Sequence, residues 1–314
     1  MSIAQRLADS ALINPGSDRV RSVAGLARRS ARSRAGRFLA EGPQCVREAL
    51  RAHLGEFDAL VPAPRDGVID ALYVTERALQ RHPDIDQLVQ RVLQPEGSPR
   101  VFVRMVSDEV LSAMSDAEHP QGVLAVCRIP ALTWAQVVER LPRLVAVMCR
   151  VQDPGNAGTV LRAADAAGAD AVVLTAGSVD LHNPKVVRST AGSLFHLPVL
   201  TGLDPAELVG RPVSDAAGGE LQVLAADGYG ALDLDELQDA SAAGREAAVE
   251  LSRPTAWLFG NEAQGLSEQE KALASHRVAV PLHGAAESLN VGTAATLCLY
   301  ASARAQRRTA EGAA

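Results

Sequence analysis

The hydrophobic pattern of residues 1–129 alternates between short apolar runs and amphipathic segments. LYVTERAL and VFVRMVSDEVLSAM each predict a strand that leads into a helix, and RFLAEGPQCVREALRA predicts another such pair around a Gly42-Pro43 turn. GVLAVCRI predicts a closing strand. The pattern therefore predicts an α/β domain over residues 1–129. We interpret the next segment, PALTWAQVVERLP at 130–142, as a linker because prolines bound it.

A second α/β pattern begins at residue 143 and continues to residue 314. RLVAVMCRV predicts a buried strand, AGTVLRAADAAGA a helix, and DAVVLTAG the next strand, which together form a βαβ unit. Four later runs predict further strands: LPVL, LQVLAAD, PTAWLFG and HRVAVPL. The acidic, alanine-rich stretch 231–253 predicts a surface helix and loop, and a closing helix is expected at about 291–308.

The distribution of charge suggests nucleic-acid binding in one segment of the chain. The net charge of −6 argues against a nonspecific nucleic-acid binder. Residues 19–37, however, carry seven arginines and no acid, so we expect this segment to contact phosphates. The RNA-binding candidates are Arg28, Arg29, Arg32, Arg34 and Arg37. A solvated basic helix is the alternative, and the chain has only two lysines, so the excess of arginine over lysine is not specific to this segment.

Composition makes several other classes of protein unexpected. No run of about 18 apolar residues occurs, so no transmembrane span is expected. The first 20 residues lack an apolar signal core, which favours a cytoplasmic protein over a secreted one. The four cysteines lie far apart and form no CxxC pair, so we expect neither a metal site nor disulfides.

Three stretches at predicted strand ends carry candidate chemistry. DPGNAGTVLR at 153–162 joins a strand to a helix, where backbone amides can hold an anion. Taken alone, this stretch favours a plain capped turn, with Arg162 paired to an acid. WLFGNEAQGLS at 257–267 places polar side chains at the carboxyl end of a strand, the usual ligand edge of an α/β sheet, or forms a simple Gly-Asn turn. VPLHGAAESLNVGTAA at 280–295 runs from a strand through a glycine-bearing loop into a helix, where Ser or Asn is also a common N-cap.

Taken together and in this order, the three stretches resemble the SpoU (TrmH) branch of the SPOUT RNA methyltransferases. The family motifs have the forms N-x-G-x-x-x-R-x-A, F-G-x-E-x-x-G-L and I-P-x-x-G-x-x-x-S-L-N-V, and all three match, with Val280 in place of the commoner isoleucine. RFLAEGPQCVREAL and HPQGVLAV also resemble the small ribosomal-protein-like α/β domain that binds RNA in such enzymes. The resemblance implies a C-terminal SPOUT α/β domain with a trefoil knot, which general topology rules would not predict.

The resemblance also implies a reaction, a cofactor and a site. It implies transfer of a methyl group from S-adenosylmethionine to a ribose 2′-hydroxyl in structured RNA, most simply 23S rRNA, by a homodimer. Arg162 matches the family's catalytic arginine, and because a guanidinium is a poor base we expect it to orient a phosphate and the hydroxyl. The other matching catalytic candidates are Asn156, Glu262, Ser288 and Asn290. The resemblance implies that the cofactor is held mostly by backbone groups. The implied cofactor-binding residues are Leu258, Phe259, Gly260, Asn261, Glu262, Val280, Leu282, Gly284, Ser288, Leu289 and Asn290.

Three alternatives stay open at this point. A Rossmann or class I methyltransferase needs a Gly-x-Gly-x-x-Gly turn, and the first candidate turn, DPGNAG, lacks that spacing. A noncatalytic RNA-binding or ribosome-assembly protein would suit the arginine-rich segment, but the intact motifs weigh against it. A tRNA 2′-O-methyltransferase is the third alternative, and the two-domain layout favours ribosomal RNA over it.

Overall fold

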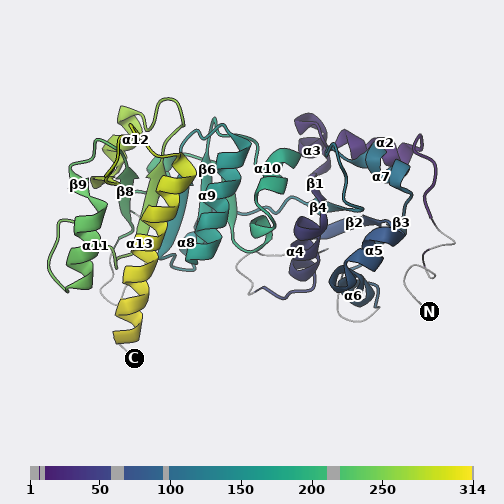
Figure 1. Ribbon diagram of the computed structural model, residues 1–314, viewed down its shortest axis with the longest axis horizontal. Helices are drawn as coiled ribbons and strands as arrows, with labels where there is room; N and C mark the ends of the chain where they lie inside the picture. Colours follow the sequence, from purple (N-terminus) through teal and green to yellow (C-terminus); the bar gives the residue numbers. More distant parts are fainter. Residues whose placement is uncertain (1–6, 8–10, 58–66, 95–98, 211–219, 313–314) are drawn as a thin grey trace. The chain divides into compact units, whose positions relative to one another are not determined.

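Two separate β-sheets organise the chain, one in each of two structural units. The computed structural model describes residues 7, 11–57, 67–94, 99–210 and 220–312 (Figure 1). Unit 1 comprises residues 1–131 and 180–196, and unit 2 comprises residues 132–179 and 197–314. The domain boundaries predicted from the sequence stay a prediction. The two structural units differ from the predicted domains in one respect: the segment 180–196 belongs to unit 1, although it lies within the predicted domain 143–314.

Unit 1 is an α/β unit, as its sequence pattern predicts. Its first elements are α2 (Asp18–Gly25), α3 (Arg29–Ala35), β1 (Arg37–Glu41), α4 (Pro43–His53), β2 (Ile69–Val74) and α5 (Glu76–Arg81). The rest are α6 (Pro83–Val92), β3 (Phe102–Met105), α7 (Asp108–Met114), β4 (Val123–Arg128) and, from the later segment, α10 (Pro184–Ser189) and η1 (Ser193–Phe195).

The sheet of unit 1 has four strands in the order β1-β4-β2-β3. β4 pairs antiparallel with both β1 and β2, and β2 pairs parallel with β3. Helices α2 and α7 cover a core that contains Leu39, Tyr73 and Leu124. α4 begins at Pro43 directly after β1, because Gly42 takes the positive φ of 85° that this turn requires.

Unit 2 contains the second α/β pattern. Its elements are α8 (Trp134–Val138), β5 (Leu144–Met148), α9 (Pro154–Ala167), β6 (Ala171–Thr175), β7 (Val199–Leu203), η2 (Pro205–Leu208), β8 (Gln222–Ala226), β9 (Leu232–Asp233), α11 (Leu234–Ala242), β10 (Thr255–Phe259), α12 (Glu268–Leu273), β11 (His276–Ala279) and α13 (Val291–Gly312). The predicted strands and the closing helix are therefore confirmed, and α11 is the predicted acidic helix.

The sheet of unit 2 is wholly parallel, with the order β7-β6-β5-β10-β8-β11-β9. All residues of β5, β6 and β10 are buried, which explains why these strands are continuous apolar runs rather than alternating ones. β10 lies between β5 and β8, so it pairs with strands from both halves of the unit. This order places the ends of β5 and β10 side by side.

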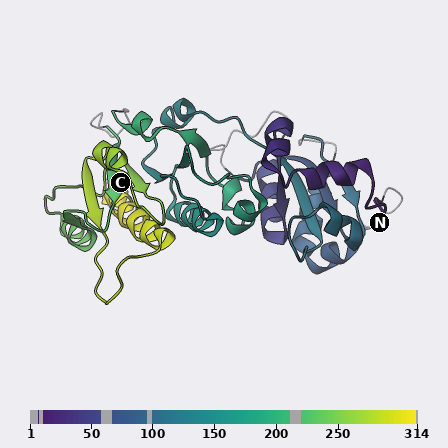
Figure 2. The same cartoon turned by 90° about the horizontal axis from the view of Figure 1, so that it is seen from above.

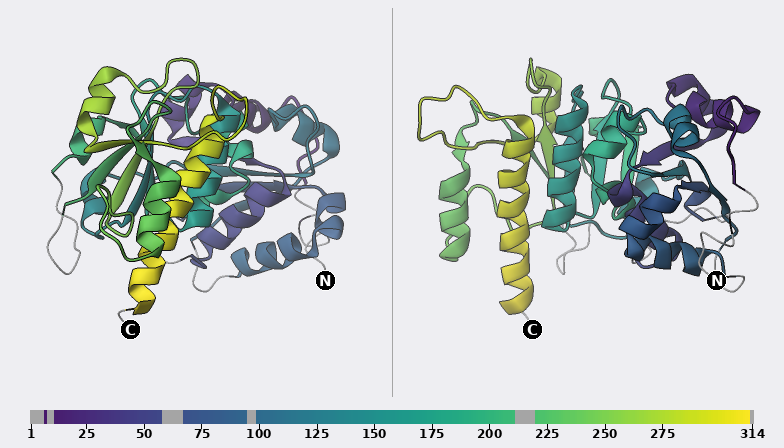
Figure 3. Two further views of the ribbon diagram at one scale, coloured as in Figure 1. Left: turned by 60° about the vertical axis from the view of Figure 1, so that its left-hand side comes forward. Right: turned by 45° about the vertical axis from the view of Figure 1, so that its right-hand side comes forward.

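Two helices that carry family motifs pack against each other in unit 2. α9 and α13 run along one another on the same side of the sheet (Figure 3). A Cβ added at Gly292 would lie 2.6 Å from Cγ2 of Thr159, so the first turn of α13 requires a glycine there. Trp257 of β10 donates a hydrogen bond from Nε1 to Oγ of Ser302 at 2.9 Å, which fixes α13 against the sheet. The helices that carry the first and third motifs are thereby held at a defined separation.

The segment predicted as a linker contains helix α8. Thr133 caps this helix in a capping box with Gln136, and the helix places Trp134 and Val137 in the core of unit 2. The prolines at its ends mark the boundaries of a packed element, so they do not indicate a free linker. Among the described residues, no helix combines the length and the apolar character needed to cross a bilayer.

Candidate active site at the ends of β5 and β10

The candidate site lies where the parallel sheet of unit 2 reverses its winding. The chain leaves β5 toward β6 at one side of the sheet, and it leaves β10 toward β11 at the other. Ligands of open α/β sheets bind at such a switch point, at the carboxyl ends of the strands. Residues 150–156 follow β5 and residues 260–266 follow β10, so the first two sequence motifs meet at this place.

Glu262 joins the first motif to the second. Its carboxylate accepts hydrogen bonds from the backbone N–H groups of Gln152 and Asp153, each at 3.2 Å, and from Nδ2 of Asn156 at 3.1 Å. Asp153 caps α9 by accepting from the N–H of Asn156 at 2.8 Å. The negative charge of Glu262 also lies at the amino-terminal end of α9, where the helix dipole favours it.

Asn290 adds the third motif to the same network. Its Nδ2 donates to Oδ1 of Asn156 at 2.8 Å, while its own Oδ1 accepts from the N–H of Gly292 at 2.8 Å. Asn290 therefore caps α13 and contacts α9 at once. The structure thus brings together Glu262, Asn156 and Asn290, three of the five residues predicted to be catalytic.

The protonation state of Glu262 follows from these contacts. Partial burial acts to raise the pKa of its carboxyl group, but the hydrogen bonds from Asn156 and from backbone amides outweigh it and hold the pKa below its usual range. Glu262 is therefore ionised at neutral pH and accepts hydrogen bonds. This favours a role in holding the two loops together over a role as a general acid.

Arg150 and Glu270, neither of which was predicted from the sequence, fix the loop that carries Glu262. Arg150 donates from Nε and Nη2 to the carboxylate of Glu270 at 2.9 and 2.7 Å, and from Nη2 to the carbonyl oxygen of Gly265 at 3.2 Å. The carbonyl oxygen of Arg150 accepts from Nδ2 of Asn261 at 2.8 Å. Arg150 thus contacts both ends of the loop 261–265, with its backbone at a φ of 57°.

Glycine 260 lets this loop fold back on strand β10. A Cβ at this position would overlap the backbone of Gly265 and Leu266. Asn261 and Gly265 exchange backbone hydrogen bonds of 3.1 and 2.8 Å and close the loop on itself. The side chains of Leu258 and Phe259 are buried in the sheet, so any ligand contact of these two predicted cofactor residues is made by backbone atoms.

The loop 280–290 between β11 and α13 extends away from the sheet (Figure 2). Leu282, Gly284 and Ser288 are exposed, and Val280 and Leu289 are half-buried. Within the described part of the chain, the backbone N–H groups of residues 282–289 have no protein acceptor. These predicted cofactor residues therefore present free backbone donors and the apolar Leu282 to a ligand, but the structure does not bring Ser288 to Glu262 or Asn156.

Comparisons with known proteins identify the family. Residues 143–300 match the SpoU rRNA Methylase family, and residues 17–125 match the MRM3-like substrate binding domain. The chain belongs to the SpoU rRNA methylase family. This SpoU protein is 32% identical over 270 residues to the Bacillus subtilis 23S rRNA (guanosine(2553)-2′-O)-methyltransferase RlmP, covering 86% of this chain and 89% of the relative.

A second relative and a solved structure are also similar to the SpoU protein. It is 32% identical over 203 residues to the 23S rRNA (uridine(2479)-2′-O)-methyltransferase of Streptomyces viridochromogenes, covering 64% of this chain and 67% of the relative. The crystal structure of the SpoU methyltransferase AviRb from Streptomyces viridochromogenes, in complex with the cofactor AdoMet, is similar with a TM-score of 0.72 and 27% identity. That likeness covers 93% of this chain and 99% of AviRb.

These findings confirm the predicted family, the SPOUT fold class and the class of S-adenosylmethionine-dependent RNA methyltransferases. They also exclude the Rossmann alternative. The trefoil knot and the roles of individual site residues stay predictions. The residues that the structure presents fit the cofactor in one respect, because the free backbone donors of 282–289 match the mostly backbone contacts that the resemblance implies.

Arg162 of the SpoU protein lies on α9 and is exposed. No hydrogen bond or ion pair joins its guanidinium to another described residue, so the alternative that it pairs with a structural acid has no support in the described part of the chain. An unpaired, exposed guanidinium on the helix that carries the first motif is available to a phosphate.

The basic segment of unit 1 requires one correction. Arg32 is only 3% exposed, and it donates to the carbonyl oxygens of Leu26 and Ala27 at 2.8 and 2.7 Å and to Asp180 at 2.6 Å. It was predicted to bind RNA, but its guanidinium is used inside the unit, where it connects α3 to the segment 180–196. Arg37 is half-buried and paired with Asp70 at 2.8 Å.

Three of the predicted RNA-binding arginines remain on the surface. Arg28, Arg29 and Arg34 are exposed. Arg29 has a long contact of 3.9 Å with Asp180 but is 80% exposed. Of the five arginines predicted to bind RNA, these three are therefore the ones available to phosphates.

Proposed function

We propose that this protein methylates a ribose 2′-hydroxyl of 23S rRNA with S-adenosylmethionine as the methyl donor. The observation that carries the proposal is the hydrogen-bonded connection of Glu262, Asn156 and Asn290, which joins the three family motifs at the switch point of the sheet. Its relatives in Bacillus subtilis and Streptomyces viridochromogenes are named as 23S rRNA 2′-O-methyltransferases, which supports this choice of RNA.

The proposed roles of the two domains follow the matches to the MRM3-like substrate binding domain and to the SpoU rRNA Methylase family. Residues 1–129 would hold the RNA and residues 143–314 would carry out the transfer. Glu262, Asn156 and Asn290 hold the loops after β5 and β10 and the start of α13 in fixed positions, while the loop 280–290 offers its backbone to the cofactor. The bound cofactor supplies an activated methyl group. Much of the rate then comes from alignment of the reacting atoms.

Arg162 is the side chain that we propose to meet the RNA at the reacting centre. Its planar guanidinium forms two parallel hydrogen bonds with a phosphate, which fixes the adjacent ribose and its 2′-hydroxyl. Ser288, exposed on the loop 280–290, is proposed to contact the same ribose when that loop closes on the ligands. The cofactor, when bound, would supply its methyl group to the 2′-oxygen and keep the electron pair of the carbon–sulfur bond on sulfur, and the hydroxyl proton would pass to solvent.

We also propose that the protein acts as a homodimer in the cytoplasm. Helix α13 exposes Leu297 and Tyr300 to 44% and 47%, an apolar stripe beside α9 that a second copy would cover. Leu297→Glu should then convert the dimer to monomers in analytical ultracentrifugation. The four buried, free cysteines support a reducing compartment.

The experiment that tests the activity is a methylation assay with the purified protein, 23S rRNA transcript and radiolabelled S-adenosylmethionine. Incorporation at one nucleotide, mapped as a 2′-O-methyl group, is the expected result. Incorporation of the methyl group into tRNA alone would identify tRNA, instead of 23S rRNA, as the substrate. RNA binding without incorporation into either RNA, in a protein that still binds the cofactor by calorimetry, would favour the noncatalytic assembly protein.

A further inference from the structure

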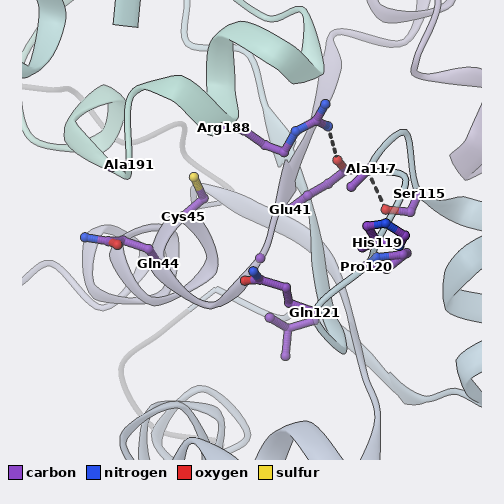
Figure 4. Close-up of a pocket in the computed structure, with 12 residues that line it drawn as sticks. Glu41, Gln44, Cys45, Ser115, Ala117, His119, Pro120, Gln121, Arg188 and Ala191 are labelled. Atoms are coloured by element: carbon purple, nitrogen blue, oxygen red, sulfur yellow. Dashed lines mark hydrogen bonds and ion pairs between the residues drawn. The ribbon is translucent and has the colours of Figure 1, made fainter. Parts of the chain in front are cut away.

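A pocket in unit 1 is lined by none of the motif residues (Figure 4). It has a volume of about 240 Å³ and is formed by the turn between β1 and α4, the loop 115–121 after α7, and the end of α10. Its size is below the roughly 300 Å³ at which pockets for drug-sized ligands begin, so it accepts a group about as large as one nucleobase. The side chains that decide its chemistry are Glu41, Gln44, Cys45, His119, Gln121 and Arg188.

The charged groups of the pocket already neutralise one another. Glu41 is 5% exposed and accepts from Oγ of Ser115 at 2.9 Å, from the N–H of Asp116 at 2.6 Å, and from Arg188. Arg188 also donates to Asp116 at 3.0 Å. Two carboxylates around one guanidinium leave no positive charge for a phosphate, and the full set of partners on Glu41 leaves little for a metal cation.

The thiol of Cys45 in the pocket is also unreactive. Burial raises the pKa of Cys45 to about 11, so it is a neutral thiol, and its Sγ donates to the carbonyl oxygen of Val187 at 3.5 Å. It lines the pocket as a small apolar group. The pocket is therefore suited to a neutral ligand.

Three polar side chains of the pocket have no protein partner among the described residues. Gln44, His119 and Gln121 are exposed, and Figure 4 shows Gln44 at one end of the pocket and His119 near the other, with Gln121 between them. Each glutamine amide offers one acceptor and two donor hydrogens in a plane, and the imidazole ring offers a flat surface. Hydrogen-bonding planes beside a flat ring match the edge and the face of a nucleobase.

The loop that presents His119 and Gln121 has a fixed shape. Gly122 follows it with a φ of 84°, its carbonyl oxygen accepts from the N–H of Thr75 at 2.9 Å, and a Cβ there would lie 2.6 Å from that of Ala78. The N–H of Gly42, which also lines the pocket, donates to the carbonyl oxygen of Val123 at 3.1 Å. A pocket held in this way loses little entropy when it binds a ligand.

We propose that this pocket receives one unpaired base of the RNA substrate, at a nucleotide other than the one that is methylated. The proposal rests on the proposed function, because it takes the RNA as the ligand. Proteins read RNA sequence mainly from bases in loops and bulges, which they stack on flat side chains and hydrogen-bond at their edges. The substrate would then carry such an unpaired base, and the enzyme would select its RNA in unit 1 by sequence as well as by charge.

The test compares Gln44→Ala/Gln121→Ala and His119→Ala with wild type in binding to 23S rRNA transcript over a series of salt concentrations. Loss of hydrogen bonds to one base lowers affinity about five- to tenfold or more. In the double glutamine variant the slope of affinity against salt stays the same, since uncharged amide side chains release no counterions. Gln87→Ala, an exposed glutamine on α6 of the same unit, is the matched control and should bind as wild type.

Each outcome decides one question. Unchanged affinity of both pocket variants, with melting temperatures equal to wild type, would overturn the pocket proposal and leave the proposed function standing. A flatter salt slope in these variants would show phosphate contacts and would also overturn it. A wild-type protein that neither binds nor methylates 23S rRNA would overturn the proposed function, and the base pocket with it.

Discussion

The polar side chains at the strand ends of unit 2 contact one another, whereas the arginines that we expect to meet RNA contact solvent. Glu262, Asn156 and Asn290 are mutual partners, and Arg150 is paired with Glu270. Arg162 has no partner among the described residues. The difference separates two kinds of motif residue. The acids and amides build the shape of the site, and the arginine is left free for the substrate.

The strongest test of this comparison is Arg162→Ala. Because the exposed guanidinium of Arg162 makes no hydrogen bond or ion pair with another described residue, the variant should keep its melting temperature and its affinity for S-adenosylmethionine. Turnover should fall about 100-fold or more, since misalignment of the reacting groups has effects of that size. Arg162→Lys should recover little of it.

Single-turnover methylation beside thermal melting measures both properties of the Arg162 variants. Arg245→Ala, an exposed arginine after α11, is the control and should behave as wild type. A parallel loss of cofactor affinity and melting temperature in Arg162→Ala would erase the distinction between the two kinds of residue. Near-normal turnover would remove Arg162 from catalysis.

The next largest effect is expected at Arg150, which belongs to the building residues. Arg150→Ala and Arg150→Gly both lose the contacts with Glu270 and Gly265, so both should bind the cofactor about tenfold more weakly, a change of roughly 1.4 kcal/mol. Glycine adopts the φ of 57° without strain, so the Gly variant should be about 1 kcal/mol more stable than the Ala variant.

Calorimetry and urea unfolding measure the two effects at Arg150. Equal stability of the two variants would show that the left-handed backbone at this position relaxes. Unchanged cofactor affinity in both would show that the loop 261–265 keeps its shape without the guanidinium.

A smaller effect separates the surface arginines from Arg32. Replacing Arg28, Arg29 and Arg34 together by alanine should weaken 23S rRNA binding and reduce the salt slope by about two to three, if each contacts one phosphate. Arg32→Ala should lower the melting temperature and leave the salt slope unchanged, because Arg32 is buried and paired with Asp180. Filter binding at several salt concentrations distinguishes them. A triple variant with the wild-type salt slope would refute the proposal that these three arginines contact RNA phosphates.

The smallest effect is expected on thermal stability when the pH is lowered. Burial acts to raise the pKa of Glu270, but the contact with Arg150 and the hydrogen bonds with Ser267 hold it below the ordinary value, as the contacts of Glu262 do. A carboxyl group with a lowered pKa stabilises the folded state above its unfolded pKa near 4.5, and this stability is lost as pH falls through the folded pKa.

The melting temperature should therefore fall on acidification below about pH 4.5, and Glu270→Gln should make that decline shallower by about 2 °C. Differential scanning calorimetry between pH 7 and 3 provides the comparison. A decline of the same steepness in the variant would show that Glu270 does not contribute to it.

The sequence predicted the strands and the motif positions of unit 2 well for a physical reason. β5, β6 and β10 are buried on both faces, and such strands have continuous apolar runs that are easily located. The polar residues that follow β5 and β10 therefore had to lie at the sheet edge. The partners of Glu262 could not be predicted, because two of them are backbone N–H groups whose direction depends on the start of α9.

Other features depend on contacts that are distant in sequence. Arg32 carries the same charge as its exposed neighbours, and only Asp180, which lies 148 residues away, shows that it is buried. Arg150 could not be identified because its positive φ has no sequence signal in a residue that is neither glycine nor asparagine. The helix α8 was missed because its flanking prolines are equally typical of linkers and helix ends.

The assignment of residues 180–196 to unit 1 limits how such enzymes exchange substrate specificity by recombination. A chimera joined only near residue 131 would combine one parent's Glu41 and Arg32 with another parent's residues at positions 188 and 180. Each mismatch would leave a buried charge without its counter-ion. A functional graft must therefore carry two separate pieces of gene, and these two pieces must be inherited together.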